Sequence, residues 1–162
     1  MSKEYLEEDC TIVIVDDEPM ITQSISNFLL LESEYNVETF NDPDEALEFL
    51  KENTADLIIT DYLMPEMNGI DFLIEAMKIQ PHTIRILLTG YADKENAIKA
   101  INEVGLFQYI EKPWDNDALK LVIRNGLDKR MLLKRLQDKI RDFESARSNL
   151  EDVQNEILKA FI

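Results

Sequence analysis

The sequence predicts an α/β fold, a doubly wound, five-stranded parallel sheet with helices on both faces, followed by an extended C-terminal helix. Two observations support this prediction. Short apolar runs typical of buried strands alternate five times with longer stretches whose apolar residues recur at helical spacing. After the fifth repeat, helical spacing continues to the end of the sequence, and Gly126 is the only helix-weakening residue beyond Pro113.

The first repeat begins with a continuous, β-branched run, Thr11–Val15, that stops at Asp16 and Asp17. Such a run indicates a strand that is buried on both faces, as in a parallel sheet. Pro19 then suits the first turn of a helix. The apolar residues of that helix share one face: Ile21, Ile25, Phe28 and Leu29.

The next two repeats follow the same order. A weaker strand over 37–40 leads through the turn and cap Asn41-Asp42-Pro43 into a helix that turns Ala46, Leu47 and Leu50 inward. A strand over 57–61 is followed by a loop rich in proline and glycine over 64–69 and a helix over 70–79.

The last two repeats complete the sheet. We expect a strand over 83–88, then a helix over 93–104 with Ala97, Ile98 and Ile101 inward. The fifth strand covers 107–110, Lys112-Pro113 breaks it, and Asp115 can cap the last helix. Because parallel strands need right-handed crossovers, the strand order should be flavodoxin-like.

Size and composition exclude several classes of protein. With 162 residues the chain can form one domain and an appendage, and its net charge of −16 argues against general affinity for nucleic acid or anionic lipid. The single cysteine, Cys10, excludes an internal disulfide and a cysteine-based metal cluster. No apolar stretch could span a membrane, and the acidic N-terminus is unlike a signal sequence, so we expect a cytoplasmic protein.

The tail differs from the rest of the chain. Residues 129–162 carry eight Lys/Arg and six Asp/Glu, a net charge of +2, so residues 1–128 carry −18. We therefore expect a compact domain over 1–128 and a helical segment over 129–162. Asp138 and Asp142 interrupt the basic residues of 129–141, which favours a solvated face over a contact with DNA.

Within the tail, seven of nine positions at alternating steps of three and four are apolar, which predicts a dimerising coiled coil. The nine positions are 133, 136, 140, 143, 147, 150, 154, 157 and 161. Arg147 and Gln154 are the polar exceptions, and Lys139 would face Glu144 of a parallel partner. The alternative is an amphipathic helix that folds back on its own domain.

Chemistry-bearing residues follow four of the predicted strands. Asp16 and Asp17 follow the first strand, Asp61 ends the third, Thr89 follows the fourth and Lys112 the fifth. Because ligands of open parallel sheets bind at the carboxyl ends of the strands, these residues should lie together. His82 precedes the fourth strand at the opposite edge, so it should be structurally incidental.

Such a group of side chains favours phosphoryl chemistry. Three neighbouring carboxylates repel one another, and a divalent cation would neutralise their charge. Mg²⁺ suits such a site because it prefers oxygen ligands and keeps coordination positions open for water and phosphate. A carboxylate can accept a phosphoryl group, while a metal ion and a lysine neutralise the charge on its oxygens. A threonine hydroxyl can bond a phosphoryl oxygen.

Four segments carry a family resemblance: Val15-Asp16-Asp17-Glu18-Pro19, Thr60-Asp61 through Asn68-Gly69, Leu88-Thr89-Gly90-Tyr91, and Tyr109-Ile110-Glu111-Lys112-Pro113. In this order the chain resembles a bacterial two-component response-regulator receiver domain over residues 9–128. The resemblance implies that Asp61 is the phosphoacceptor for a partner histidine kinase or phosphotransfer protein. It also implies that Asp16, Asp17, Asp61 and the backbone carbonyl of Leu63 serve the Mg²⁺ ion.

The resemblance assigns roles to three further residues. Lys112 would pair with the phosphoryl group, and the bond before Pro113 would be cis. Thr89 and Tyr109 would form a coupled switch that changes the surface of the fourth helix, the fifth strand and the fifth helix, and so controls dimerisation or a downstream output domain. The chain would then not be an enzyme, and its activity would be at most self-phosphorylation and self-dephosphorylation.

The side chains near the site set the expected lifetime of the phosphoryl group. Leu63 and Tyr91, each two residues after a site residue, offer no acid or amide to orient a hydrolytic water, so self-dephosphorylation should be slow. Leu63 also argues against an aspartyl phosphatase, which typically has a second acid there. The intact site argues against a pseudo-receiver, and the tail has no histidine that would make it a sensor kinase.

Overall fold

The computed structural model describes residues 5–161, apart from the side chain of Tyr91. It divides into two compact units, of which the first ends at Arg130 and the second begins at Met131. No helix among residues 5–161 is both long and apolar enough to cross a membrane.

The first unit is a five-stranded parallel sheet in the order β2-β1-β3-β4-β5, which confirms the predicted doubly wound, flavodoxin-like fold. The strands are β1 Thr11–Val15, β2 Asn36–Phe40, β3 Leu57–Asp61, β4 Ile84–Thr89 and β5 Gln108–Glu111. The helices are α1 Pro19–Glu32, α2 Pro43–Glu52, α3 Gly69–Ile79, α4 Lys94–Glu103 and α5 Asn116–Ala160. Two single turns of 3₁₀ helix, η1 Glu7–Asp9 and η2 Tyr91–Asp93, were not predicted.

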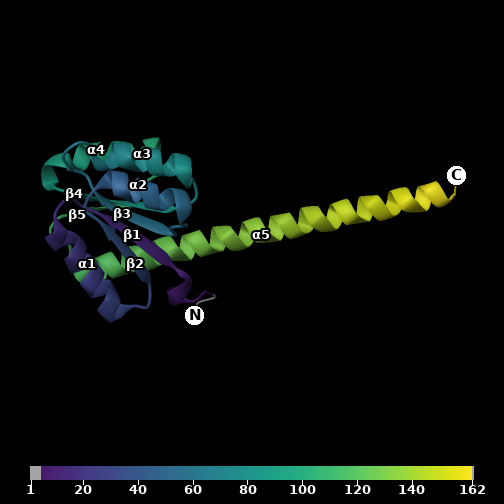
Figure 1. Ribbon diagram of the computed structural model, residues 1–162, viewed down its shortest axis with the longest axis horizontal. Coiled ribbons are helices and arrows are strands. Elements are labelled where there is room, and N and C mark those ends of the chain that lie inside the picture. Colours follow the sequence, from purple (N-terminus) through teal and green to yellow (C-terminus); the bar gives the residue numbers. More distant parts are fainter. Residues whose placement is uncertain (1–4, 162) are drawn as a thin grey trace. The chain divides into compact units, whose positions relative to one another are not determined.

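Helices cover both faces of the sheet (Figure 1). Helices α2, α3 and α4 pack on one face, where Val13 and Ile58 point, and α1 and the first turns of α5 pack on the other. Alternate residues of each central strand serve the two faces, so β1 and β3 are buried almost throughout. The core therefore lies on both sides of β1, β3 and β4.

The predicted helix starts are confirmed at two caps. The carboxylate of Asp42 accepts the Asp44 N–H at 2.9 Å at the start of α2, and Asp115 accepts the Ala118 N–H at 3.2 Å at the start of α5. Both bonds satisfy donors that the first helical turn leaves without a partner. The peptide bond between Lys112 and Pro113 is cis, as the resemblance implied.

One prediction of a helix face was wrong. In α4 the buried residues are Ala97 and Ala100, whereas Ile98 is 48% and Ile101 40% exposed. The small alanine side chains face the core, and the two larger residues are placed one position further round the helix. The prediction placed the larger apolar side chains inward, although Ala97 and Ala100 lie on the face that packs on the sheet. Ile98 and Ile101 instead form an exposed apolar pair on α4.

Gly69 marks the closest approach of a helix to the sheet. A Cβ at Gly69 would overlap the backbone carbonyl oxygen of Asp61 and lie 2.9 Å from Leu87 Cδ1. The Gly69 N–H also donates to the carbonyl of Tyr62 at 2.8 Å. The absence of a side chain thus lets α3 begin directly behind the end of β3.

We predict that Gly69→Ala lowers the free energy of unfolding by about 2–4 kcal/mol, because the new methyl group overlaps backbone that cannot move aside. Gly90→Ala is the matched control, since its Cβ would meet only Asp93 Oδ2 at 3.8 Å. The control should change stability by less than about 1 kcal/mol. Urea denaturation measures both, and equal losses in the two variants would contradict the packing argument.

Candidate functional site

The hydrogen-bond register of the sheet brings two carboxylates together. Val15 of β1 is paired with Thr60 of β3, so the next residues, Asp16 and Asp61, are neighbours at the carboxyl edge. Adjacent strands lie about 4.8 Å apart, which leaves little room between the two side chains. Asp16 is fully buried and Asp61 nearly so, while Asp17 is more open to solvent.

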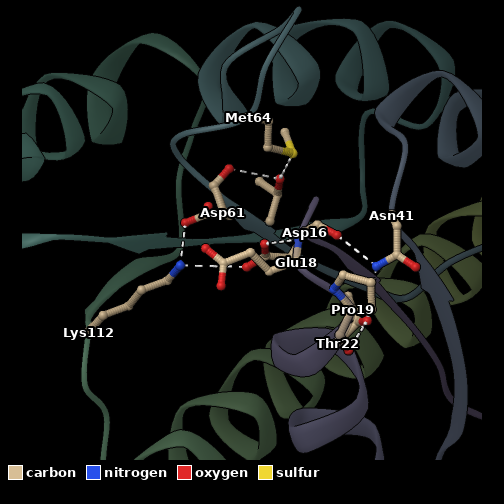
Figure 2. Close-up of polar contacts among 9 residues, drawn as sticks. Asp16, Glu18, Pro19, Thr22, Asn41, Asp61, Met64 and Lys112 are labelled. Atoms are coloured by element: carbon tan, nitrogen blue, oxygen red, sulfur yellow. Dashed lines mark hydrogen bonds and ion pairs between the residues drawn. The ribbon is translucent and has the colours of Figure 1, made fainter.

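Local hydrogen bonds hold Asp16 in place (Figure 2). Its Oδ1 accepts the Glu18 N–H at 2.9 Å, and its backbone carbonyl accepts a hydrogen bond from Asn41 Nδ2 at 2.9 Å. The same amide donates to Thr22 Oγ1 at 3.1 Å. Sequence reasoning identified Asn41 only as part of a cap, although its place after a strand was a signal that could have assigned it to the site.

The backbone around Asp61 is fixed from two sides. The hydroxyl of Thr60 donates to the Asp61 carbonyl at 3.1 Å, and the Tyr62 N–H donates to the carbonyl of Leu88 at 2.9 Å. Gly69 lies directly behind the Asp61 carbonyl, as described above. These contacts hold the backbone of Asp61 at the end of β3.

Lys112 directly follows β5, and its ammonium group points toward Asp61 and Asp16 (Figure 2). Its Nζ lies 2.8 Å from Asp61 Oδ1 and 3.5 Å from Asp16 Oδ2. The second distance is an ion pair without hydrogen-bond geometry, because Asp16 Oδ2 accepts no hydrogen bond from the part of the chain that is described. One ammonium group thus compensates the cluster only in part.

Burial and mutual repulsion perturb the protonation of the site. Burial raises the pKa of Asp16 to about 6, and the charge of Asp61 adds to this, whereas the Glu18 N–H and Lys112 oppose it. Burial also raises the pKa of Asp61, against the opposing effect of Lys112. For Lys112, burial alone would lower the pKa, but its pairing with Asp61 and Asp16 outweighs burial and raises it.

The site fits a divalent cation with oxygen ligands. Asp16, Asp17 and Asp61 each offer a carboxylate oxygen, and these oxygens lie within 4.8 Å of one another. The buried Asp16 Oδ2 accepts no hydrogen bond among the described residues and lies 3.5 Å from the Lys112 ammonium, so a bound cation would give it a closer partner. Hard oxygen donors with open positions suit Mg²⁺.

The other predicted site residues lie on β4, on β5 and after β3. Thr89 ends β4, its buried hydroxyl donates to the Gly90 carbonyl at 3.1 Å, and its own carbonyl accepts the Lys112 N–H at 2.9 Å. Tyr109 is half-buried in β5 and packs against the core, and the Leu63 side chain is 64% exposed. The predicted role of the Tyr91 side chain lies outside the described residues.

His82 was expected to be incidental, and it lies at the opposite edge of the sheet. It occupies the exposed turn before β4 and lines a cavity of about 380 Å³ with residues such as Gln80 and Arg130. No site carboxylate lines that cavity.

Comparison with known proteins identifies the family. Residues 12–124 match the model of the response regulator receiver domain. Over 122 residues the chain is 34% identical to the hydrogenase transcriptional regulatory protein HoxA of Cupriavidus necator, and over 126 residues 32% identical to the regulatory protein AtoC of Escherichia coli. These alignments cover 75% and 78% of this chain.

The chain belongs to the response regulator receiver family. This family is one of phosphoacceptor switches. The chain spans only about a quarter of the length of these curated relatives, 25% of HoxA and 27% of AtoC.

Solved receiver structures have the same fold. A response regulator receiver domain protein from Clostridium thermocellum matches with a TM-score of 0.71 at 37% identity, covering 76% of this chain and 98% of that one. The signal receiver domain of an HD domain-containing protein from Pseudomonas fluorescens matches with a TM-score of 0.70 at 34% identity, covering 75% and 97%. Both matches cover nearly all of the compared chain and leave part of this one outside.

We predict that Asp16→Asn raises the free energy of unfolding of the metal-free receiver by about 1–2 kcal/mol at pH 7, because it removes a buried carboxylate from the cluster. The pKa of Asp16 is raised in the fold, so the native protein binds more protons than the unfolded chain between about pH 4 and pH 6. The carboxylate therefore costs stability as pH rises through this window, and the advantage of Asp16→Asn should shrink towards pH 4.

Chemical denaturation in a chelator at several pH values measures this difference. Glu52→Gln is the control, because Glu52 is exposed at the end of α2 and no part of the acidic cluster. It should change stability by less than about 0.5 kcal/mol. The prediction is contradicted if Asp16→Asn is less stable than the wild type at pH 7, or if its gain in stability grows as the pH falls. Either result would show that the buried carboxylate of Asp16 does not cost stability.

Proposed function

We propose that Asp61 accepts a phosphoryl group from a phosphohistidine of a partner histidine kinase or phosphotransfer protein. The observation that carries the proposal is the 2.8 Å ion pair between Lys112 and Asp61 within a cluster of three carboxylates. Of these carboxylates, Asp61 pairs more closely with the lysine, at 2.8 Å against 3.5 Å for Asp16. Membership of the receiver family supports the same assignment.

The transfer needs a nucleophile and compensation of charge. A carboxylate oxygen of Asp61 attacks phosphorus while the phosphorus–nitrogen bond of the phosphohistidine breaks, and the imidazole leaves with the bonding electron pair. The product is an acyl phosphate on Asp61. The ammonium group of Lys112 is within reach of Asp61, so it can move its ion pair to an oxygen of the transferred group.

The proposed Mg²⁺ ligands are Asp16, Asp17, Asp61 and the backbone carbonyl of Leu63. When bound, Mg²⁺ would neutralise negative charge on the phosphoryl oxygens. The acidic cluster supports this assignment through its oxygen donors and its excess negative charge. The chain's own part in the chemistry is to hold these carboxylates together and to supply Asp61 and Lys112.

Thr89 and Tyr109 are the proposed switch. The hydroxyl of Thr89 donates to the adjacent Gly90 carbonyl, a partner it can exchange for a phosphoryl oxygen. The half-buried ring of Tyr109 would then enter the space beside β4. This change would alter the surface formed by α4, β5 and α5, where Ile98 and Ile101 are exposed. A modest population shift between two packings suffices for signalling.

Several properties of the whole protein are part of the proposal. We assign residues 1–128 to the receiver domain and residues 129–162 to a coiled-coil linker or dimerisation segment that makes the protein a homodimer. A downstream effector domain is the proposed target of the switch, since the curated relatives are transcriptional regulators and one structural neighbour is an HD domain-containing protein. The proposal also includes a cytoplasmic location and self-phosphorylation from small phosphodonors.

We predict that a small phosphodonor such as acetyl phosphate adds one phosphoryl group in the presence of Mg²⁺, and that Asp61→Asn abolishes the addition. Intact-mass spectrometry measures the product. Asp71→Asn is the matched control, because Asp71 is an exposed carboxylate in the first turn of α3 and is no part of the acidic cluster. Labelling of Asp61→Asn at the wild-type level, or no labelling of the wild type with Mg²⁺ present, would refute the assignment.

The decay of the same label tests the expected lifetime. The exposed Leu63 side chain cannot accept a hydrogen bond from a water molecule at the mouth of the site. The label should therefore persist for minutes or longer once the phosphodonor is removed. A half-life of seconds would contradict slow self-dephosphorylation without affecting the assignment of Asp61.

A further inference from the structure

The second unit exposes an apolar stripe. Its described residues form the continuation of α5, and no second helix or strand lies within this unit. Apolar side chains recur along it and are exposed to solvent, namely Leu133, Leu136, Ile140, Phe143, Leu150, Val153 and Ile157. A single helix has no core of its own, so a stripe of this length indicates a partner helix.

A seven-residue repeat fixes one of the two core columns of a coiled coil. Leu136, Phe143, Leu150 and Ile157 are spaced by seven residues and form this column. The second column can lie four residues or three residues after each member. The first choice gives Arg147 and Gln154, the register predicted from the sequence. The second choice gives Ala146 and Val153, with Ala160 after Ile157.

From Phe143 onward the second choice buries apolar residues in place of polar ones, whereas after Leu136 it gives Lys139 where the first choice gives Ile140. With Arg147 in the core, two guanidinium groups would face each other across the dimer, and Val153, which is 52% exposed, would stay outside the core. With Ala146 and Val153 in the core, every core position from Phe143 to Ala160 is apolar. A narrow alanine beside Phe143 also lets a large and a small side chain alternate along the interface.

Charge complementarity favours the same arrangement. In this register Arg147 flanks the core, where it lies 3.9 Å from Glu151 of its own helix. Asp142 occupies the other flank, five residues earlier. In a parallel pair these two flanking positions face each other across the interface, so Asp142 of one copy meets Arg147 of the other.

We propose that two copies of this chain pair in parallel through Phe143, Ala146, Leu150, Val153 and Ile157, and that Arg147 and Gln154 flank this core. The proposal rests on the homodimer proposed above and specifies its partner, its direction and its register. It replaces the predicted contact between Lys139 and Glu144 with one between Asp142 and Arg147.

Cysteine cross-linking of the full-length chain tests the register. A disulfide forms only between residues whose Cα atoms lie within about 7 Å, so core positions cross-link with their counterparts and outer positions do not. The wild type is a usable background because its one cysteine, Cys10, is fully buried in the first unit. Single cysteines are placed in matched neighbours, Ala146→Cys against Arg147→Cys and Val153→Cys against Gln154→Cys.

Mild oxidation is followed on non-reducing gels, with and without Mg²⁺ and beryllofluoride as a phosphoryl mimic. Ala146→Cys and Val153→Cys should cross-link at least about tenfold faster than their neighbours. Faster cross-linking of Arg147→Cys and Gln154→Cys would overturn this register and leave the homodimer intact. Circular dichroism checks that each variant keeps its helical content.

Three further variants separate the register from the dimer itself. Leu136→Cys and Leu150→Cys lie in the column that both registers share, and both react only if the copies are parallel and aligned. Ser148→Cys lies outside the core in either register and should not react. If neither Leu136→Cys nor Leu150→Cys cross-links in either state, the parallel homodimer is refuted together with its register, whereas the assignment of Asp61 is unaffected.

Discussion

Asp16 and Asp61 end neighbouring parallel strands, and the pairing of Val15 with Thr60 forces their carboxylates to lie side by side at the edge of the sheet. The two negative charges repel each other. The side chains cannot move apart, because both residues are buried and the strands that carry them form the core. The fold thus concentrates negative charge at one point and stabilises it with packing elsewhere. The proposed affinity for a cation and the proposed capacity of Asp61 to accept a phosphoryl group both follow from this one constraint.

Lys112 compensates the negative charge of the carboxylates only in part, so the site can still respond to a further charged group. Its ammonium group pairs closely with Asp61 and more distantly with Asp16, so one Asp16 oxygen is buried without a hydrogen bond among the described residues. The Lys112 backbone N–H is bonded to the Thr89 carbonyl. In the proposed switch, a change of charge at Asp61 would therefore act on groups tied to β4 and β5.

The strands and the grouping of Asp16, Asp61 and Lys112 at their carboxyl ends were predictable from the sequence because the same pattern encodes both. A buried β-branched run followed by Asp, Thr or Lys identifies a strand and the residue at its carboxyl end, so Asp16, Asp61 and Lys112 followed from the order of the strands. Asn41 was missed as a support of Asp16 because β2 is an exposed edge strand with a weak apolar pattern.

Other features depend on distances that a sequence pattern does not contain. The apolar pattern placed Ile98 and Ile101 in the core, whereas the close packing of α4 on the sheet admits only Ala97 and Ala100. The role of Gly69 likewise depends on how close α3 comes to the Asp61 carbonyl. Protonation of Asp16 depends on its burial as well as on its neighbours, and neither is visible in the sequence.

The most direct test of the central claim is the dependence of stability on Mg²⁺. Above its dissociation constant, a single bound ion should raise the free energy of unfolding by about 1.4 kcal/mol for each tenfold increase in free Mg²⁺, beyond any effect of NaCl at matched ionic strength. Asp17→Asn should weaken this dependence. If Mg²⁺ stabilises the protein no more than NaCl does, the carboxylates at the carboxyl ends of β1 and β3 do not form a cation site, and the central claim is contradicted.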